Sequence, residues 1–277
     1  MNNASNDTQR IELNPRAGWL GIWPVQGLRA VLDPENARIR AFLVEQAGQL
    51  ASGALVLDAG AGRKPYRRLF AQQTYQSTDM PGGFYEEPHD FECFLHEIPK
   101  PDNHYDAVVL TQVLEHVPDP WATLKEIHRV LKPNGRLLLS VPLTAPLHGE
   151  PWHFFHFTHY ALHRMAISLG FAPRDIEKVG GAFWVLGKRL PDAFRKLFKQ
   201  YDPFRARKRH QNPLLCLVLN VVLLPLYLLG YLPAAYILRL LFYWLDALDR
   251  EKSFTLGYTL VLVKQNTPSV KEEPYEN

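Results

Sequence analysis

Short apolar runs alternate with longer amphipathic stretches along the middle of the chain. Runs at 54–58, 74–78, 107–110, 136–141 and 255–263 predict strands, and the continuous apolar run at 54–58 is typical of a central parallel strand that is covered on both faces. Amphipathic helical stretches begin at Asp33, Asp119 and Thr158, which are residue types that cap helices. Strands that alternate with helices predict an α/β fold with a mostly parallel sheet.

A different pattern begins after Gly181. Seven Lys or Arg and a single acid lie between Arg195 and Arg209, and no charged residue follows from 211 to 238. We therefore divide the chain into an N-terminal extension (1–32), a main domain (33–190), a basic and apolar insertion (191–253), the last strand of the main sheet (254–266) and a tail (267–277). Both ends of the chain are polar enough to predict loose tails.

The uncharged part of the insertion is long enough to cross a bilayer of about 30 Å once. Because the last strand must return to the main sheet, both ends of the insertion lie on one side of a membrane, and two crossings would need about 40 residues. Pro225, Gly230 and Pro233 also interrupt it. We predict a bent, shallow hairpin in the membrane, with the basic run bound to the anionic surface. The alternative is that the insertion forms a soluble helical cap or a dimer interface instead of a membrane hairpin.

Composition limits the class of protein. The 277 residues are 47% hydrophobic and carry a net charge of only +3, so no nucleic-acid partner is expected. Two cysteines suit a reducing compartment, and the N-terminus lacks the basic and apolar pattern of a cleavable signal. The predicted location is cytoplasmic, at the inner face of the membrane.

A glycine turn follows the first strand. Asp58, Gly60 and Gly62 end that strand, and Asp79 ends the next one, 21 positions after Asp58. Glycines there allow close approach of a ligand, and a carboxylate at the second strand end can accept bonds from ribose hydroxyls. A dinucleotide site needs a third glycine where this chain has Pro65. A nucleoside-type cofactor with an ammonium group fits better, and an NAD(P)-dependent oxidoreductase is the alternative.

These residues, together with the blocks 105–117 and 131–135, resemble the class I S-adenosylmethionine-dependent methyltransferases of the methyltransferase-domain group. The resemblance implies a Rossmann-like, mostly parallel seven-stranded sheet with helices on both faces, and S-adenosyl-L-methionine as the cofactor. It also implies contacts to the methionine moiety from Asp58, Ala59, Gly60 and Gly62, to the ribose from Asp79, to adenine from Met80, and to the sulfonium region from Thr111 and Gln112.

The acceptor is expected over the loop 146–158, beyond the fifth strand. Five histidines fall between positions 148 and 163. His148 or His153 is the candidate general base for a hydroxyl acceptor, unless the loop histidines are purely structural. A zinc site formed by His159 and His163 lacks a third ligand, so no metal site is predicted. Glu115 and His116 are assigned a structural role.

The loop and the insertion also resemble a subgroup found with cell-surface polysaccharide and glycolipid synthesis. We therefore predict a methyltransferase at the membrane surface that acts on a lipid-linked or amphiphilic acceptor, with a glycan or glycolipid hydroxyl as the first choice. A catalytically silent membrane adaptor is a further alternative. The acceptor atom, the pathway and the oligomeric state stay open.

Overall fold

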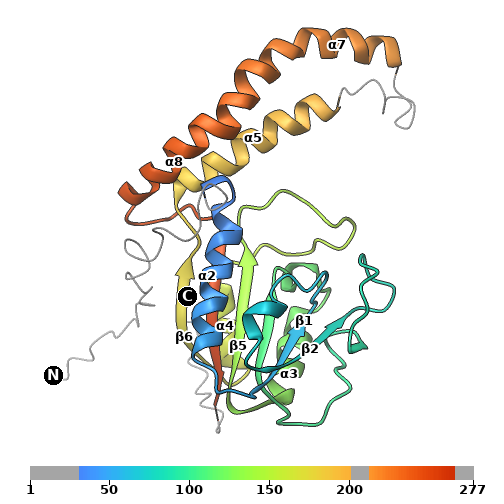
Figure 1. Cartoon of the computed structure of the whole chain (residues 1–277), viewed down its shortest axis with the longest axis vertical. Helices are drawn as coiled ribbons and strands as arrows, with labels where there is room; N and C mark the ends of the chain where they lie inside the picture. The colour runs from blue at the N-terminus through green and yellow to red at the C-terminus, as the bar shows by residue number, and fades with distance from the viewer. Residues whose placement is uncertain (1–30, 201–211, 266–277) are drawn as a thin grey trace, which may run out of the picture.

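A seven-stranded sheet forms the centre of the computed structural model, which describes residues 31–200 and 212–265 (Figure 1). The strand order is β3-β2-β1-β4-β5-β7-β6, and within the described residues β7 runs in the opposite direction to the other six strands. The predicted Rossmann-like fold class is confirmed. The strands are β1 (Leu55–Ala59), β2 (Thr74–Asp79), β3 (Phe91–Glu92), β4 (Tyr105–Thr111), β5 (Leu131–Pro142), β6 (Phe171–Lys178) and β7 (Gly257–Lys264).

Helices cover both faces of the sheet. The α-helix α2 (Pro34–Gly48) and the short η2 (Arg67–Phe70) lie on one face, whereas α3 (Pro120–Val130) and α4 (His159–Ser168) lie on the other. Asp119 and Thr158 cap α3 and α4 as predicted, by accepting the backbone N–H groups of Ala122 and Ala161. Asp33 makes no such cap.

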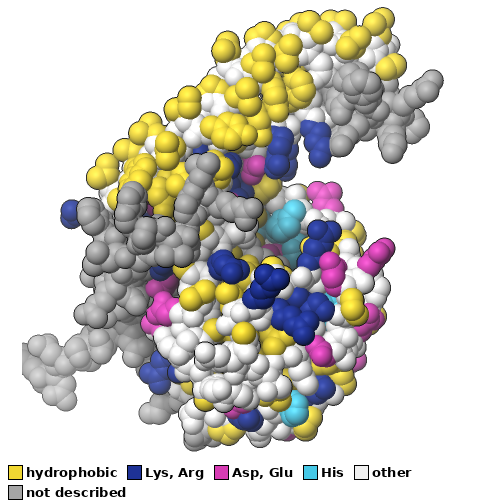
Figure 2. All heavy atoms as spheres, in the orientation of Figure 1, with side chains coloured by type: hydrophobic (Ala, Val, Ile, Leu, Met, Phe, Trp, Pro, Cys, Tyr) yellow, Lys and Arg dark blue, Asp and Glu magenta, His cyan; other side chains and the backbone are white. Residues whose placement is uncertain are grey.

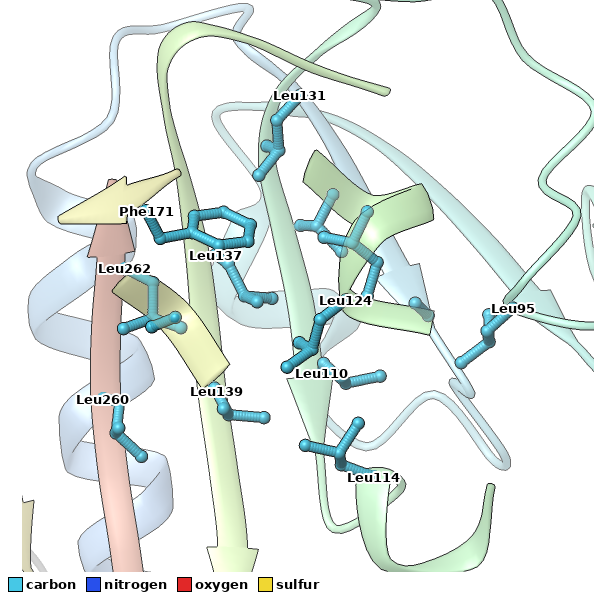
Figure 3. Packing of buried hydrophobic residues seen from close by; sticks show 14 of the residues in the cluster. Leu95, Leu110, Leu114, Leu124, Leu131, Leu137, Leu139, Phe171, Leu260 and Leu262 are labelled. Carbon is cyan, nitrogen blue, oxygen red and sulfur yellow. The ribbon is translucent and has the colours of Figure 1, made fainter. Parts of the chain in front are cut away.

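The larger apolar core lies between the sheet and α3 and α4. Leu110, Leu137 and Leu139 of the central strands meet Leu124 of α3 there, and all four are buried (Figure 3). Alternate positions of the same strands, such as Val109, face α2 in a second cluster. Both faces of the central strands are therefore apolar, which explains their continuous apolar runs.

Two strands, β6 and β3, were not predicted from the sequence. β6 is an edge strand with Pro173 and several charged residues, so it lacks the apolar run of a central strand. β3 has two residues. The turn around Asn134 lies within β5, where the pairing with β4 shifts register between Tyr105 and Ala107.

The insertion is a long helical hairpin between β6 and β7. Its first arm is α5 (Ala182–Gln200), so the predicted domain boundary at residue 190 lies inside this helix. The second arm runs back beside α5 (Figure 1). It consists of α7 (Pro213–Leu226), η5 (Tyr227–Tyr231), η6 (Ala234–Leu238), α8 (Arg239–Leu245) and η7 (Asp246–Leu248).

The apolar stretch does not fold back on itself, contrary to our prediction. Pro225 lies inside α7, and the turns that follow are π-helical, which is how a helix absorbs a missing backbone donor. A Cβ on Gly230 would lie 2.9 Å from the Phe194 ring, so this glycine lets the two arms approach. Of the basic run, Arg205, Arg207, Lys208 and Arg209 lie outside the described residues.

Carboxylates join the two arms of the hairpin at its base. Asp246 accepts the backbone N–H groups of Gly181, at 2.9 and 3.0 Å, and of Trp184, at 3.0 Å. A Cβ on Gly181 would lie 2.4 Å from Asp249, so the glycine is needed for this close approach. Lys188 of α5 also pairs with Asp33 at the start of α2, at 3.0 Å. The hairpin is thus held at its base by contacts on both sides.

Replacing Asp246 by alanine should destabilise the base of the hairpin. Asp246→Ala would leave the N–H groups of Gly181 and Trp184 buried without acceptors, and each such group costs about 1–3 kcal/mol. We expect the free energy of unfolding to fall by about 2 kcal/mol or more, measured by thermal unfolding in detergent. Asp192→Ala, which removes only pairs within α5, is the control and should cost less than about 1 kcal/mol. Equal losses in the two variants would contradict this role.

Candidate functional site

The functional edge of the sheet is where the parallel strands end. Thr111 at the end of β4 pairs with Ser140 of β5, and Pro142 at the end of β5 pairs with Gly257. Lys178 at the end of β6 pairs with Tyr258. The hairpin therefore connects the end of β6 to the start of β7, and both of these points lie at the same edge of the sheet as the glycine turn. Ligands of open α/β sheets bind at this edge.

The glycine turn has the backbone geometry that a close ligand contact requires. Gly60 and Gly62 both have positive φ, at 73° and 50°. The N–H groups of Gly60 and Ala61 donate to the Thr78 carbonyl of the neighbouring strand, at 2.9 and 3.0 Å. A Cβ on Gly60 would lie 2.6 Å from the Val113 side chain, so the position excludes any larger residue.

Asp79 lies beside this turn with a fixed carboxylate. Its Oδ2 accepts the N–H of Gly62 and its Oδ1 accepts the N–H of Met80, both at 2.8 Å. A carboxylate oxygen has two lone pairs, so each oxygen can accept one further bond. The carboxylate therefore keeps the accepting capacity that the ribose contact predicted for Asp79 would need.

Asp58 is a buried acid, with 2% of its surface exposed. Burial raises its pKa to about 6, the Asp79 charge adds to the rise, and a hydrogen bond from Tyr75 opposes it. The Tyr75 hydroxyl lies 2.5 Å from Asp58 Oδ2; nothing in the sequence pattern indicated this contact. A buried carboxylate of this kind favours a cationic partner, which fits the ammonium group of a methionine moiety.

The other predicted cofactor residues lie along the same edge. Ala59 is buried in the sheet, and Met80 is half-buried directly after Asp79. Gln112 follows β4 with a φ of 56° and donates its N–H to the Ser140 carbonyl at 2.9 Å. A non-glycine residue in this conformation stores strain, which clusters at functional sites. With Thr111 beside it, Gln112 lies where the resemblance puts the sulfonium.

The two candidate bases in the acceptor loop differ in their hydrogen bonds and in their exposure. His153 Nδ1 accepts the backbone N–H of His148 at 3.2 Å, so its lone pair is already used. His148 is exposed, and its Nε2 lies 3.2 Å from Nε2 of His116. His148 is therefore the more accessible candidate of the two. Trp152 and Phe154 are each 43% exposed, so they do not close the loop against water.

Glu115 is a buried acid that the sequence analysis assigned to structure. Its side chain has no exposed surface, and neither carboxylate oxygen has a hydrogen-bond partner in the described part of the chain. Burial raises its pKa to about 8. Its backbone carbonyl accepts the N–H of Phe154 at 2.9 Å, which brings the acceptor loop to the end of β4. The pair of Glu115 and His116 is thus part of the acceptor side.

Loss of the Asp79 carboxylate should weaken S-adenosylmethionine binding. Hydrogen bonds to a charged group contribute about 1.5–3 kcal/mol, so Asp79→Ala should lower the affinity about tenfold or more in calorimetry. Asp106→Ala is the matched control, because Asp106 also accepts a backbone N–H, that of Leu55 at 2.8 Å, but at the opposite edge of the sheet. An unchanged affinity in Asp79→Ala would refute the ribose assignment.

Binding should also depend on pH through Asp58. If the ionised carboxylate binds the ammonium group, affinity is greatest above the pKa of about 6 and falls as the acid is protonated. Between pH 7 and pH 5 we expect the affinity to drop about tenfold. Asp58→Asn should bind more weakly and lose this dependence. A wild-type affinity that rises on acidification would contradict the assignment.

Comparisons with known proteins identify the family of this chain. A family model described as a methyltransferase domain matches residues 32–170, which is half of the chain. The chain is similar to a ubiquinone/menaquinone biosynthesis C-methyltransferase of Desulfotalea psychrophila, at 30% identity over 137 residues, or 44% of this chain and 54% of that protein. The corresponding enzyme of Psychromonas ingrahamii is 46% identical over 64 residues, covering 22% and 25%. The chain thus spans about a quarter to a half of these relatives.

The chain is also similar to several solved structures. The chain is similar to the [4+2]-cyclase SpnF, with a TM-score of 0.49 and 20% identity, over 86% of this chain and 94% of that one. It is also similar to a Burkholderia thailandensis 1,6-didemethyltoxoflavin-N1-methyltransferase with bound S-adenosylhomocysteine, with a TM-score of 0.46 and 17% identity, over 86% and 79%. The family match leaves the oxidoreductase alternative unsupported. This chain belongs to the methyltransferase domain family, whose cofactor is S-adenosylmethionine.

Proposed function

We propose that the chain transfers a methyl group from S-adenosylmethionine to an amphiphilic acceptor held at the cytoplasmic face of a membrane. One observation carries the proposal: the apolar helical hairpin stands on the edge of the sheet that holds the cofactor residues. An acceptor whose lipid part lies in a membrane can then present its polar part to the same edge.

The second arm of the hairpin exposes a large apolar surface. Figure 2 shows hydrophobic side chains over the outer side of the hairpin, with Lys and Arg on the side toward the sheet domain. Val222, Leu229 and Ile237 are 67%, 77% and 67% exposed. Exposed apolar patches of this extent mark interaction or membrane surfaces. Aromatic residues suited to a membrane interface, such as Tyr236 and Trp244, lie on the same arm.

A surface-lying orientation suits this hairpin better than a crossing. One helix in the described residues, Tyr227–Leu248, is long and apolar enough to cross a membrane. Its partner α5 carries Lys188, Arg189 and Asp192 along its length, so α5 is unsuited to the bilayer interior. Because both ends of the hairpin join one edge of the sheet, the apolar arm fits best in the outer part of one leaflet, in contact with α5.

The acceptor loop is itself partly apolar. Leu147 is 64% exposed and lies next to His148, with Trp152 and Phe154 further along the same loop. Figure 1 shows the long loop after β5 at the end of the sheet nearest the hairpin. Exposed apolar side chains beside a polar cluster suit an acceptor that has both an apolar part and a polar part.

The chain's own residues mainly position the reactants. When bound, S-adenosylmethionine supplies the methyl group, and the bond from carbon to sulfur breaks as the bond to the acceptor forms. Asp79 and the glycine turn orient the donor, and the acceptor loop aligns the nucleophile, since collinear alignment is the main contribution that a protein can make. A hydroxyl acceptor also loses a proton, and the lone pair of His148 lies on the acceptor side to receive it.

Two acceptor classes are consistent with this arrangement. A glycan or glycolipid hydroxyl is the first candidate, from the resemblance of the loop and insertion. The second is a quinone precursor, because relatives of this chain are named for ubiquinone and menaquinone biosynthesis. Purified chain, labelled S-adenosylmethionine and membrane lipid extract should yield labelled lipid, whose chromatographic fraction identifies the class. Asp79→Ala is the control. Label transfer to no lipid fraction would refute the proposal and favour a silent adaptor.

Membrane binding should depend on the apolar arm. Replacing Val222, Leu229 and Ile237 by Asp should lower binding to anionic vesicles about 100-fold or more, because each apolar side chain withdrawn from water contributes about 1.5–3 kcal/mol. Flotation with vesicles measures this, and wild-type binding should persist in high salt. Val44→Asp on α2, where Val44 is 52% exposed, is the control. Flotation of the triple variant like wild type would refute the membrane surface and favour a cap or dimer interface.

A further inference from the structure

Three side chains with metal-ligating atoms converge where β4 meets the acceptor loop. Glu115 and His116 lie in η3 (Leu114–His116), and His148 lies in the loop after β5. One ligand atom from each lies within 4.8 Å of the others. His116 Nε2 lies 3.2 Å from His148 Nε2 and 3.7 Å from Glu115 Oε1. The three groups come from segments 32 positions apart in the chain, so the fold brings them together.

Backbone carbonyls determine which imidazole nitrogens carry hydrogen. Nδ1 of His116 lies 2.6 Å from the Trp152 carbonyl, and Nδ1 of His148 lies 2.9 Å from the Pro146 carbonyl. A carbonyl oxygen only accepts, so each Nδ1 donates, and each Nε2 of the neutral rings has a lone pair. Two lone pairs therefore point into the same small space, beside a buried carboxylate without a partner. Such an arrangement is repulsive unless a proton or a metal ion lies between the groups.

The spacing also fits a single metal ion. Two imidazole nitrogens bound to zinc at about 2.0–2.1 Å in tetrahedral geometry are about 3.3 Å apart, close to the 3.2 Å between the Nε2 atoms here. Hydrogen bonds from Nδ1 to backbone carbonyls are the usual support of metal-bound histidines. The ligand atoms are thus already near their bound positions.

We propose that Glu115, His116 and His148 bind a divalent transition metal ion, with zinc as the reference ion. Two imidazoles and one carboxylate suit zinc and its first-row neighbours better than magnesium or calcium, which prefer oxygen ligands. Glu115 is fully buried and His148 is exposed, so the ion is open to solvent on the acceptor side. Three protein ligands with an open position are typical of catalytic metal sites.

The surrounding loop is shaped to hold these ligands. Gly149 has a φ of 62°, and a Cβ there would lie 3.2 Å from Cε1 of His116. His153 accepts the backbone N–H of His148, which makes it a positioning residue. The sequence analysis predicted no metal site because it considered only His159 and His163, which share one helix.

If the proposed function holds, the ion also has a role in the reaction. Its open position can take the acceptor's hydroxyl oxygen, and coordination lowers the pKa of that hydroxyl. The proton then leaves to solvent, the oxygen gains the methyl carbon, and the sulfur leaves with the electron pair of its bond. In this arrangement His148 acts as a ligand instead of the general base. The binding site itself does not depend on this role.

Metal binding can be measured without an acceptor. The untagged full-length chain in detergent, stripped with a chelator, should bind one Zn²⁺ per chain in calorimetry, and Co²⁺ should give the visible absorption of a four- or five-coordinate ion. His148→Ala and Glu115→Gln should each lower the Zn²⁺ affinity about 100-fold or more, since even loss of an outer partner costs about 10–100-fold. His163→Ala on α4 is the control and should bind like wild type.

The outcomes separate this site from the proposed function. S-adenosylmethionine affinity should be unchanged in His148→Ala, which also shows that this exposed-loop variant is folded. Zinc binding that is lost in the ligand variants supports the site even if no lipid acceptor is ever labelled. Absence of bound Zn²⁺ and Co²⁺ at micromolar concentrations, or equal binding by wild type and both ligand variants, would overturn it. Loss of binding in His163→Ala alone would instead assign the ion to α4.

Discussion

The antiparallel pairing of β7 with β5 and β6 is the constraint on which the rest of the structure depends. Because β7 runs against its neighbours, its first residue, Gly257, lies opposite Pro142 at the end of β5. The chain between β6 and β7 must therefore begin and end at one edge of the sheet. That edge is the one where parallel strands present their ligand-binding loops, so any segment inserted there lies next to the site. The position of the apolar hairpin follows from strand direction alone.

Buried carboxylates are the second common feature of this edge. Asp58 and Glu115 have pKa values raised by burial, and neither forms an ion pair with a Lys or Arg within the described residues. A buried acid is stabilised in its charged form only by a cation or by several donors. In the proposed function, the ammonium group of the cofactor would supply this charge to Asp58, and the proposed metal ion would supply it to Glu115. One physical rule thus accounts for both acids.

The sequence was informative where local patterns decide the structure. The glycine turn, Asp79 and the caps of α3 and α4 are determined by neighbouring residues, so the prediction and the structure agree there. β6 was missed because an edge strand tolerates Pro173 and charged residues. The contacts of Tyr75 with Asp58 and of His148 with His116 join segments distant in sequence, and no spacing rule reveals them. The geometry of the glycine turn could therefore be predicted, whereas the contacts within the acceptor cluster could not.

The hairpin shows why local signals fail in a helix that has a partner. Pro225 and Gly230 predict breaks when each is considered alone, yet the arm stays helical because packing against α5 offsets the cost. Gly230 is the point of contact with Phe194, so the residue that looks like a hinge is where the two arms approach. This contact holds the apolar arm against α5 and leaves its other side, with Val222 and Leu229, exposed. Packing within the hairpin thus determines which face of the apolar arm is exposed, and the contacts of Asp246 with Gly181 and Trp184 join the end of that arm to the start of α5.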